Sequence, residues 1–295
     1  MPQVSIVMRS MNDIQYIEKT LKAIFNQKFT NFELINIDSG STDGTCEIIE
    51  KYNPGKFFKI KPEEYIPGVV LNNAIRECAG EIIVFNNSDC IPQNSDWLGN
   101  LICPLLDIPQ IAASFGNQEP RPDAKPLVRK DHLRAFGDGI ISASWEHFFS
   151  LATSAALKEV LIEHPFAEDL QYSEDIEWSY RMKKHGYIIA YVPDAIVEHS
   201  HNYSQKALWK RFYNEGLAEG RIYGRRKMFL RGFLLPWLLE TARDCKYLIG
   251  CGNVTAIPGG VAYRFRQRLA AWKGRGDYFK NSRTSSGEHT AGKRV

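Results

Sequence analysis

The sequence lacks several features that would assign it to a broad class of protein. No uninterrupted apolar run among its 295 residues reaches the roughly 20 positions that a membrane-spanning helix needs. The amino terminus enters a predicted strand without the basic and apolar regions of a signal peptide. These absences predict a cytoplasmic protein. Thirty-seven Lys and Arg against 34 Asp and Glu leave a net charge of only +3, which argues against nucleic acid as a partner.

Motifs that define common nucleotide and metal sites are also missing. The G-x-G-x-x-G of dinucleotide-binding folds does not follow the first predicted strand, and no P-loop with G-K-[ST] is present, which argues against hydride transfer and ATP hydrolysis. The six cysteines stand far apart, without the paired spacing of a zinc site. We expect most of them to be small core residues with free thiols.

Strand-like and helix-like segments alternate through the first half of the chain, which predicts an α/β fold with a mostly parallel central sheet flanked by helices. The predicted strands cover residues 4–8, 33–37, 57–60 and 81–85. Helical stripes lie between them at Tyr16, Leu21, Ile24 and Phe25, then at Ile48 and Ile49, and then at Val70, Ala74 and Ile75.

The second half is less regular. It contains a predicted helix at 174–185, a strand at 187–192, a short strand ending at His199, and helical stretches from about residue 204. We expect one large domain over 1–203 and a helical C-terminal extension over 204–280. The segment 281–295 has almost no apolar residues, so a disordered tail is predicted there.

Acidic residues stand at two places where chemistry is expected. Asp89 follows the apolar run of GEIIVFNNSDCIP, and ligands of parallel sheets bind beyond the carboxyl ends of strands. Glu174 and Asp175 form a second acidic site in SEDIEWSYR. Each site has a structural alternative, because Asp89 can cap a turn and the acidic pair can favour the positive end of a helix.

Asp38 ends the second predicted strand and opens the loop DSGSTDGT. Its carboxylate is suited to accept a hydrogen bond from the imide N–H of uracil or thymine, which adenine does not offer. In the alternative interpretation, Ser41 or Thr42 caps the next helix and Asp43 favours its positive end.

Four segments, VSIVMRSMND, FELINIDSGSTDGT, AGEIIVFNNSDCIP and SEDIEWSYR, resemble the family 2 glycosyltransferases of GT-A fold in their order and spacing over roughly the first 200 residues. FGNQEPRPDA and YVPDAIVEHSHNYS resemble bacterial rhamnosyltransferases of cell-surface polysaccharide synthesis. The resemblance implies a catalytic domain over 1–203, with a nucleotide-binding half at 1–117 and an acceptor-binding half at 118–203.

The resemblance also implies roles for individual residues. The nucleotide site would contain Arg9, Ser10, Asp38, Asn72 and Ser88. Asp175 would be the catalytic base, with Glu174 beside it. Asp89 would hold Mg²⁺ or Mn²⁺, although Asn87 replaces the first acid of the DXD motif and leaves metal dependence open.

Trp178 and His199 extend the predicted site. Trp178 lies one helical turn after Asp175, so it is a candidate platform for the acceptor sugar, with core packing as the alternative. His199 and His201 alternate on an extended segment, and His199 is the preferred additional metal ligand. A surface loop would give the same spacing without a site.

These roles predict an inverting transferase that moves a sugar from a UDP- or dTDP-linked donor, with dTDP-rhamnose as one candidate, to a hydroxyl of a glycan or lipid-linked acceptor. A sugar nucleotidyltransferase is one alternative, but RSMND lacks the glycines of its phosphate loop. A non-catalytic nucleotide-sugar binder or assembly partner is another, favoured by Asn87 and opposed by the retained Asp89 and Asp175.

Residues 221–240 mix basic, aromatic and aliphatic side chains. Such a segment is typical of a helix at a membrane interface, which would bring the protein to the inner face of the membrane and to a lipid-linked acceptor. The alternative is a helix whose apolar face packs on the domain or on another subunit of a homo-oligomer.

Overall fold

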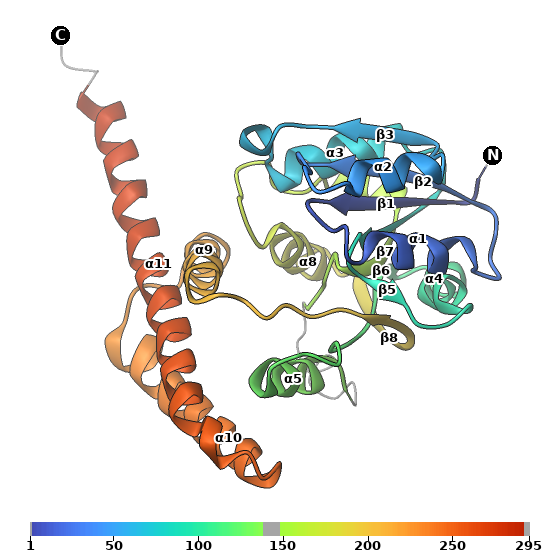
Figure 1. Cartoon of the computed structure of the whole chain (residues 1–295). Coiled ribbons are helices and arrows are strands. Elements are labelled where there is room, and N and C mark those ends of the chain that lie inside the picture. The colour runs from blue at the N-terminus through green and yellow to red at the C-terminus, as the bar shows by residue number, and fades with distance from the viewer. Residues whose placement is uncertain (1, 138–147, 292–295) are drawn as a thin grey trace. The chain divides into compact units, whose positions relative to one another are not determined.

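The computed structural model describes residues 2–137 and 148–291 (Figure 1). The chain divides into two compact units. The N-terminal unit comprises residues 1–124 and 131–200, and the C-terminal unit comprises residues 125–130 and 201–295. The predicted domain boundary at 203/204 therefore falls three residues from this division, and the short segment 125–130 belongs with the C-terminal residues.

The N-terminal unit contains an eight-stranded sheet and its covering helices. The strands are β1 (Val4–Ser10), β2 (Phe32–Asp38), β3 (Lys56–Lys59), β4 (Ile82–Asn87), β5 (Ile91–Pro92), β6 (Ile111–Glu119), β7 (Thr153–Leu157) and β8 (Ile188–Glu198). The helices are α1 (Ile17–Phe25), α2 (Thr45–Lys51), α3 (Pro67–Glu77), α4 (Trp97–Asp107), α7 (Lys158–Glu163) and α8 (Glu174–Lys184), with short turns η1 (Pro62–Glu64) and η2 (Leu133–Gly137). Helix α5 (Pro126–His132) crosses the division, and its residues 126–130 belong to the C-terminal unit.

The sheet order is β3-β2-β1-β4-β7-β6-β8-β5. The pairings show that β1, β2, β3, β4, β6 and β8 run in one direction, whereas β5 and β7 run in the other. The mostly parallel sheet and its four N-terminal strands are therefore confirmed. Parallel strands end at a common edge, so the polar residues that follow them are brought together.

One strand prediction in the second half is corrected. The two segments expected as separate strands form the single strand β8, whose pairing jumps from Gly116–Val192 to Asn117–Ile196. Residues 193–195 form a bulge there. Pro193 has no backbone N–H to contribute to the ladder, so pairing is interrupted without ending the strand.

Alternating strand residues build a core on each face of the sheet. Val7, Ile35 and Phe85 pack with α3, α7 and α8 on one face, and Ile6, Leu34 and Val84 pack with α1, α2 and α4 on the other. Phe25, predicted to belong to the buried stripe of its helix, is 44% exposed. One residue past Ile24 is a 100° rotation, which turns Phe25 out of the stripe toward Tyr52.

The C-terminal unit is helical, as predicted, with α9 (Gln205–Tyr223), η3 (Leu230–Leu234), α10 (Leu235–Gly250), η4 (Val254–Ala256) and α11 (Ile257–Ala291). Helix α11 covers residues 281–291 of the segment predicted to be disordered, and residues 292–295 lie outside the described part. Extending an existing helix is easier than nucleating one, which accounts for the continuation. Within the described residues, no helix has the length and apolar content needed to cross a bilayer.

Candidate functional site

Arg9, near the end of β1, joins two parts of the predicted site. Its guanidinium donates to Asn87 Oδ1 at 3.2 Å from Nη2 and to Glu174 Oε1 at 3.1 Å from Nη1. Nη1 also donates to the Tyr65 hydroxyl at 3.2 Å. Burial opposes the charge of Arg9, but Tyr65 and Glu174 outweigh it and raise the guanidinium pKa. Arg9 therefore ties the carboxyl end of β4 to the start of α8.

Asp175 occupies the first turn of α8, immediately after Ser173 and Glu174. Ser173 has a φ of 64°, a left-handed conformation that costs a non-glycine residue of the order of 1 kcal/mol. Burial and the neighbouring Glu174 raise the pKa of Asp175 to about 7, against hydrogen bonds from the backbone N–H groups of Ile176 and Leu151. A carboxylate with this pKa can exchange a proton near neutral pH.

The loop before α8 is held by α3. Asn72 accepts a hydrogen bond from Phe166 N at 3.0 Å and donates to Phe166 O at 2.9 Å and Glu168 Oε1 at 3.0 Å. At Gly68 the two backbones approach so closely that a Cβ would lie 2.1 Å from Ala167 O. The nucleotide role predicted for Asn72 is not supported by this placement, because its buried amide is engaged in anchoring the loop.

Trp178 also differs from its predicted role. It is fully buried, its indole N–H donates to His164 O at 2.7 Å, and its ring packs on Phe149 and Phe166. Positions 174, 178 and 182 form the buried stripe of α8, so the side chain faces the core. Trp178 offers no exposed surface to an acceptor sugar, and the core-packing alternative is the correct one.

Asp89 lies beyond β4 within a buried polar cluster. Arg121 Nη2 is 3.2 Å from Asp89 Oδ2, and His199 Nε2 is 3.6 Å from the same oxygen. His199 Nδ1 is 2.8 Å from Gln118 Oε1, an atom that only accepts, so Nδ1 donates to it and Gln118 orients the imidazole with Nε2 toward Asp89. His201 lies in the C-terminal unit, with its ring against Tyr203.

The chemistry of this cluster fits a divalent cation. Ligand atoms of Asp89, Cys90 and His199 lie within 4.8 Å of one another. Burial and the adjacent Asp89 raise the pKa of Cys90 well above its ordinary value, so the sulfur stays protonated and is not a thiolate ligand. Asp89 and His199 remain as an oxygen and a nitrogen donor, a pair that suits Mn²⁺. Asn87, which replaces an acid of the DXD motif, instead accepts from Arg9.

Asp38 organises the loop after β2. Its Oδ1 accepts the backbone N–H groups of Gly40 and Ser41 at 3.0 and 2.7 Å, and its Oδ2 accepts the hydroxyls of Ser10 and Ser41 at 2.7 and 2.6 Å. Burial alone would raise the pKa of Asp38, but the hydrogen bonds lower it. Asp38 is therefore an ionised acceptor at the predicted nucleotide site.

The remaining predicted loop residues have structural partners as well. Ser88 donates to Asp13 Oδ2, which links the loops after β4 and β1. Gly44, not Ser41 or Thr42, is the N-cap residue of α2, so the predicted hydroxyl cap is wrong. Asp43 does lie at this helix end, where its Oδ1 accepts the Thr45 N–H at 3.1 Å.

Two residues of the site were missed by sequence reasoning. Arg121 pairs with Asp89 and stacks on Tyr16 at 3.8 Å, and Gln118 orients His199. Both lie at or just past the end of β6, a strand that the sequence analysis did not recognise. The motif FGNQEPRPDA contains both, so recognising it as a strand end would have indicated them.

The sequence profile described as Glycosyl transferase family 2 matches residues 5–163, more than half of the chain. The chain belongs to this family of glycosyltransferases. The O-antigen chain rhamnosyltransferase RfbN of Salmonella typhimurium (strain LT2) is 28% identical over 229 residues, 73% of this chain and 72% of RfbN. The O-antigen chain rhamnosyltransferase WbaN of Salmonella anatum is 32% identical over 206 residues, 65% of this chain and 64% of WbaN, slightly under two thirds of its length.

Solved structures share the GT-A fold of this glycosyltransferase. The mannosyltransferase PcManGT from Pyrobaculum calidifontis, in complex with GDP-Man and Mn²⁺, matches with a TM-score of 0.61 and 19% identity over 92% of this chain and 74% of its own. Glucosyl-3-phosphoglycerate synthase from Mycobacterium tuberculosis, in complex with Mn²⁺, UDP and phosphoglyceric acid, matches with a TM-score of 0.55 and 21% identity over 75% and 78% of the two chains.

Proposed function

We propose that this enzyme is an inverting glycosyltransferase of surface polysaccharide synthesis, which moves a sugar from a nucleotide-diphosphate donor to a hydroxyl of a glycan or lipid-linked acceptor. The observation that carries the proposal is the bridge made by Arg9. Its contacts with Asn87 and Glu174 connect the segment of Asp89 to that of Asp175. This bridge supports the assignment of two acidic motifs, more than 80 residues apart, to one site.

Asp175 is the proposed base. As the acceptor oxygen forms a bond to the anomeric carbon, the bond from that carbon to the diphosphate oxygen breaks and its electron pair leaves with the nucleoside diphosphate. The hydroxyl proton passes to Asp175, whose raised pKa of about 7 matches this task. A single displacement inverts the anomeric centre. Glu174 is held by Arg9 and is the supporting acid rather than the base.

Asp89 and His199 are the proposed ligands of Mn²⁺ or Mg²⁺. Such an ion, when bound, supplies a positive charge that stabilises the departing diphosphate. The oxygen and nitrogen donors at this site support the assignment, and the Mn²⁺ complexes named above support it by analogy of fold. Gln118 orients His199, and Arg121 keeps the Asp89 carboxylate in place.

The donor is proposed to be a UDP- or dTDP-sugar. Asp38 is ionised and lies at the end of β2, where it can meet a pyrimidine imide if a hydroxyl of Ser10 or Ser41 turns away. The names of the two Salmonella relatives make dTDP-rhamnose the first donor to try. Ser10 and Ser88 are proposed to line the same nucleotide pocket.

A donor panel tests the proposal. The protein is incubated with UDP-, dTDP- and GDP-sugars, with and without Mn²⁺, and release of nucleoside diphosphate is measured for wild type and Asp175→Asn. Metal-dependent release of the diphosphate from one donor, lost in the variant, is the expected result. Release of pyrophosphate from a nucleoside triphosphate and a sugar phosphate would instead identify a nucleotidyltransferase. Binding of a donor without any turnover, also in the presence of polysaccharide acceptors, would identify a non-catalytic binder.

A further inference from the structure

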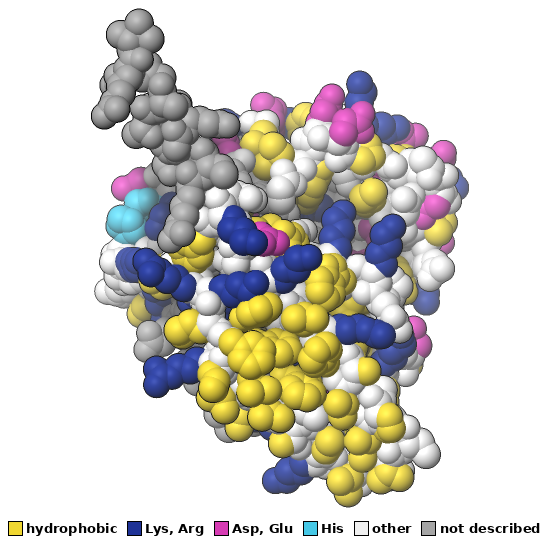
Figure 2. Space-filling view, turned by 90° about the vertical axis from the view of Figure 1, so that its left-hand side faces the viewer, with side chains coloured by type: hydrophobic (Ala, Val, Ile, Leu, Met, Phe, Trp, Pro, Cys, Tyr) yellow, Lys and Arg dark blue, Asp and Glu magenta, His cyan; other side chains and the backbone are white. Residues whose placement is uncertain are grey.

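One face of the C-terminal unit exposes an unusual number of large apolar side chains. We call residues 225–239 the interfacial segment. Its exposed members, each between 47% and 58% accessible, are Met228, Phe229, Leu230, Leu235, Leu238 and Leu239. Figure 2 shows hydrophobic side chains gathered on one face of the molecule with Lys and Arg along the margin. Contiguous apolar surface of this kind marks a protein or membrane contact.

The packing of the segment explains why these side chains point outward. Phe233 is buried, and its ring lies 5.5 Å from that of Phe265 and 5.9 Å from that of Trp272 on α11. Arg275, also on α11, donates to the carbonyl of Gly232. The inner side of η3 is therefore fixed on α11, and its outer side, together with the start of α10, is left to solvent.

A shallow apolar groove of about 740 Å³ adjoins α10 in the same unit. Trp209, Trp237 and Phe265 line it, and Lys206 and Arg266 contribute cations. Tryptophan beside lysine or arginine is the combination found where proteins meet the headgroup level of a bilayer.

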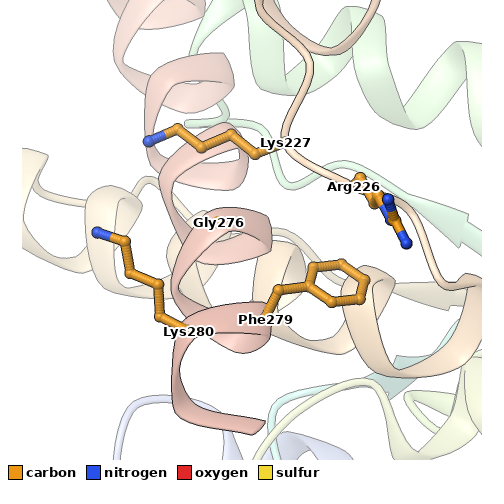
Figure 3. Close-up of a pocket in the computed structure, with 5 residues that line it drawn as sticks. All are labelled: Arg226, Lys227, Gly276, Phe279 and Lys280. Atoms are coloured by element: carbon orange, nitrogen blue, oxygen red, sulfur yellow. The ribbon is translucent and has the colours of Figure 1, made fainter. Parts of the chain in front are cut away.

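Cations line a second hollow between the start of the interfacial segment and α11. This pocket of about 310 Å³ is lined by Arg226, Lys227, Gly276, Phe279 and Lys280 (Figure 3). Lys227 and Lys280 extend toward the same side of α11 in that view. A Cβ at position 276 would lie 2.5 Å from Lys227 Cδ, so the glycine makes room for the lysine. Arg226 points to the opposite side from the two lysine ends in that view, and Lys280 Nζ lies 3.9 Å from Asp277 Oδ1. The three side chains therefore do not converge on one point, but they place positive charge beside the exposed apolar residues, which suits a surface of anionic headgroups.

The charges on this face distinguish between two possible partners, a second copy of the chain and an anionic membrane. Residues 221–239 contain five Lys or Arg and no Asp or Glu. The nearby Glu219 and Glu240 are already paired within the unit, with Arg275 and Arg243 respectively. A second copy of the chain would set like charges against each other, whereas an anionic membrane would complement them.

We propose that the interfacial segment docks on a membrane surface that contains anionic phospholipids. The exposed Phe and Leu side chains enter the boundary between headgroups and acyl chains, and the basic side chains of Arg226, Lys227 and Lys280 meet the anionic headgroups. The proposal can be tested separately from the proposed sugar transfer, because vesicle binding is measured without donor or acceptor.

Flotation of the full-length protein with vesicles tests the proposal. Binding is expected to vesicles of phosphatidylcholine with phosphatidylglycerol, to weaken as salt is added, and to be much weaker with phosphatidylcholine alone. The double variant Phe229→Ser/Leu239→Ser and the double variant Arg226→Glu/Lys280→Glu are each expected to lower the partition coefficient roughly tenfold or more. Circular dichroism verifies that both variants are folded.

Matched controls come from exposed positions of the N-terminal unit. Leu106→Ser/Ile162→Ser and Lys19→Glu/Lys51→Glu remove the same kinds of side chain and are expected to leave vesicle binding unchanged. Three results would overturn the proposal. The first is no binding to anionic vesicles at low salt. The second is a solution dimer, measured by sedimentation, that Phe229→Ser/Leu239→Ser dissociates. The third is stabilisation by inorganic phosphate that depends on Arg226 and Lys280, without vesicle binding, which would indicate a soluble ligand.

Discussion

Asp89 and Asp175 are the two acids of the proposed site, and their surroundings differ in character. Asp89 has the guanidinium of Arg121 within 3.2 Å and an imidazole within 3.6 Å. Asp175 follows another acid, Glu174, and burial together with that neighbour raises its pKa to about 7. Asp89 thus has basic neighbours, whereas burial and Glu174 favour the protonation of Asp175.

This difference indicates how one residue type can serve two functions. A carboxylate that remains ionised can hold a cation, whereas one that titrates near neutral pH can accept a proton from an alcohol. Arg9 forms its ion pair with Glu174, the acid beside Asp175, and its charge only partly offsets the raised pKa of Asp175. Experiments that change one carboxylate at a time can test whether the two functions are separate.

The largest effect is expected from Asp175→Asn. The amide cannot accept the acceptor's proton, so kcat should fall roughly 10³-fold while the dissociation constant of the donor changes little. Steady-state kinetics and calorimetric donor binding measure the two quantities. Near-normal turnover in this variant would assign the base to another residue.

Asp89→Asn should weaken the binding of metal and donor more than it lowers kcat at saturating metal. Loss of the ligand charge is expected to raise the dissociation constants of Mn²⁺ and of the metal–donor complex roughly 10- to 100-fold, with much of kcat recovered at saturating metal. Isothermal calorimetry measures the binding, and Asp107→Asn, at an exposed acid, is the control. Unchanged metal affinity would remove Asp89 from the ligand set.

The pH dependence of kcat/KM sharpens the comparison further. Because a base acts only when deprotonated, activity should fall tenfold per pH unit below about 7, the pKa of Asp175, and reach a plateau above it. The residual activity of Asp175→Asn should lack this limb. An inflection near pH 4 in wild type would show that the carboxyl is not perturbed in the working enzyme.

Gln118→Ala tests whether Gln118 orients His199, a proposed metal ligand. Without the Gln118 carbonyl, the imidazole of His199 loses the partner that fixes its orientation, and Mn²⁺ affinity is expected to fall roughly tenfold. The pH at which kcat/KM falls should not change, because this fall is attributed to protonation of Asp175. Gln110→Ala, at an exposed position, is the matched control. A change in this pH would mean that the surroundings of Asp89 and Asp175 are coupled.

The smallest effect is expected in folding stability. The folded-state pKa of Asp175 lies above the unfolded value near 3.9, so protonation favours the fold. This contribution is fully present below pH 4 and is lost as the pH rises through about 7. Asp175→Asn should therefore raise the unfolding midpoint relative to wild type at pH 8 and not at pH 4. Equal shifts at both pH values would contradict the buried-carboxylate explanation.

The parts of the fold predicted correctly are those with strong local signals. The apolar residues within Val4–Ser10 and Ile82–Asn87 predict buried strands, and the parallel topology then places Asp38 and Asp89 at one edge of the sheet. Strand β6 was missed because Ile111–Glu119 contains alanine, serine, glycine and amide residues, whose strand preference is weak. Gln118 and Arg121 were missed for the same reason, because they lie at or just past the end of β6.

Trp178 and Asn72 have structural partners that are distant in sequence. Nothing near Trp178 reveals that its face of α8 packs against Phe149 and Phe166, and nothing near Asn72 reveals that its amide binds the backbone of residue 166. Sequence motifs located the acidic residues, but only the tertiary packing decides which of their neighbours face the site and which face the core.

The contact at Gly68 has a practical consequence for engineering acceptor preference. Helix α3 and the residue-167 backbone meet with no side chain between them, so even one added methyl group at position 68 would displace the chain that leads into Asp175. Mutagenesis libraries aimed at new acceptors should therefore keep Gly68, Asn72 and its partner Glu168 constant and vary the exposed Asp169 and Gln171. The position of Asp175, the proposed base, would then be preserved while the exposed surface beside it changes.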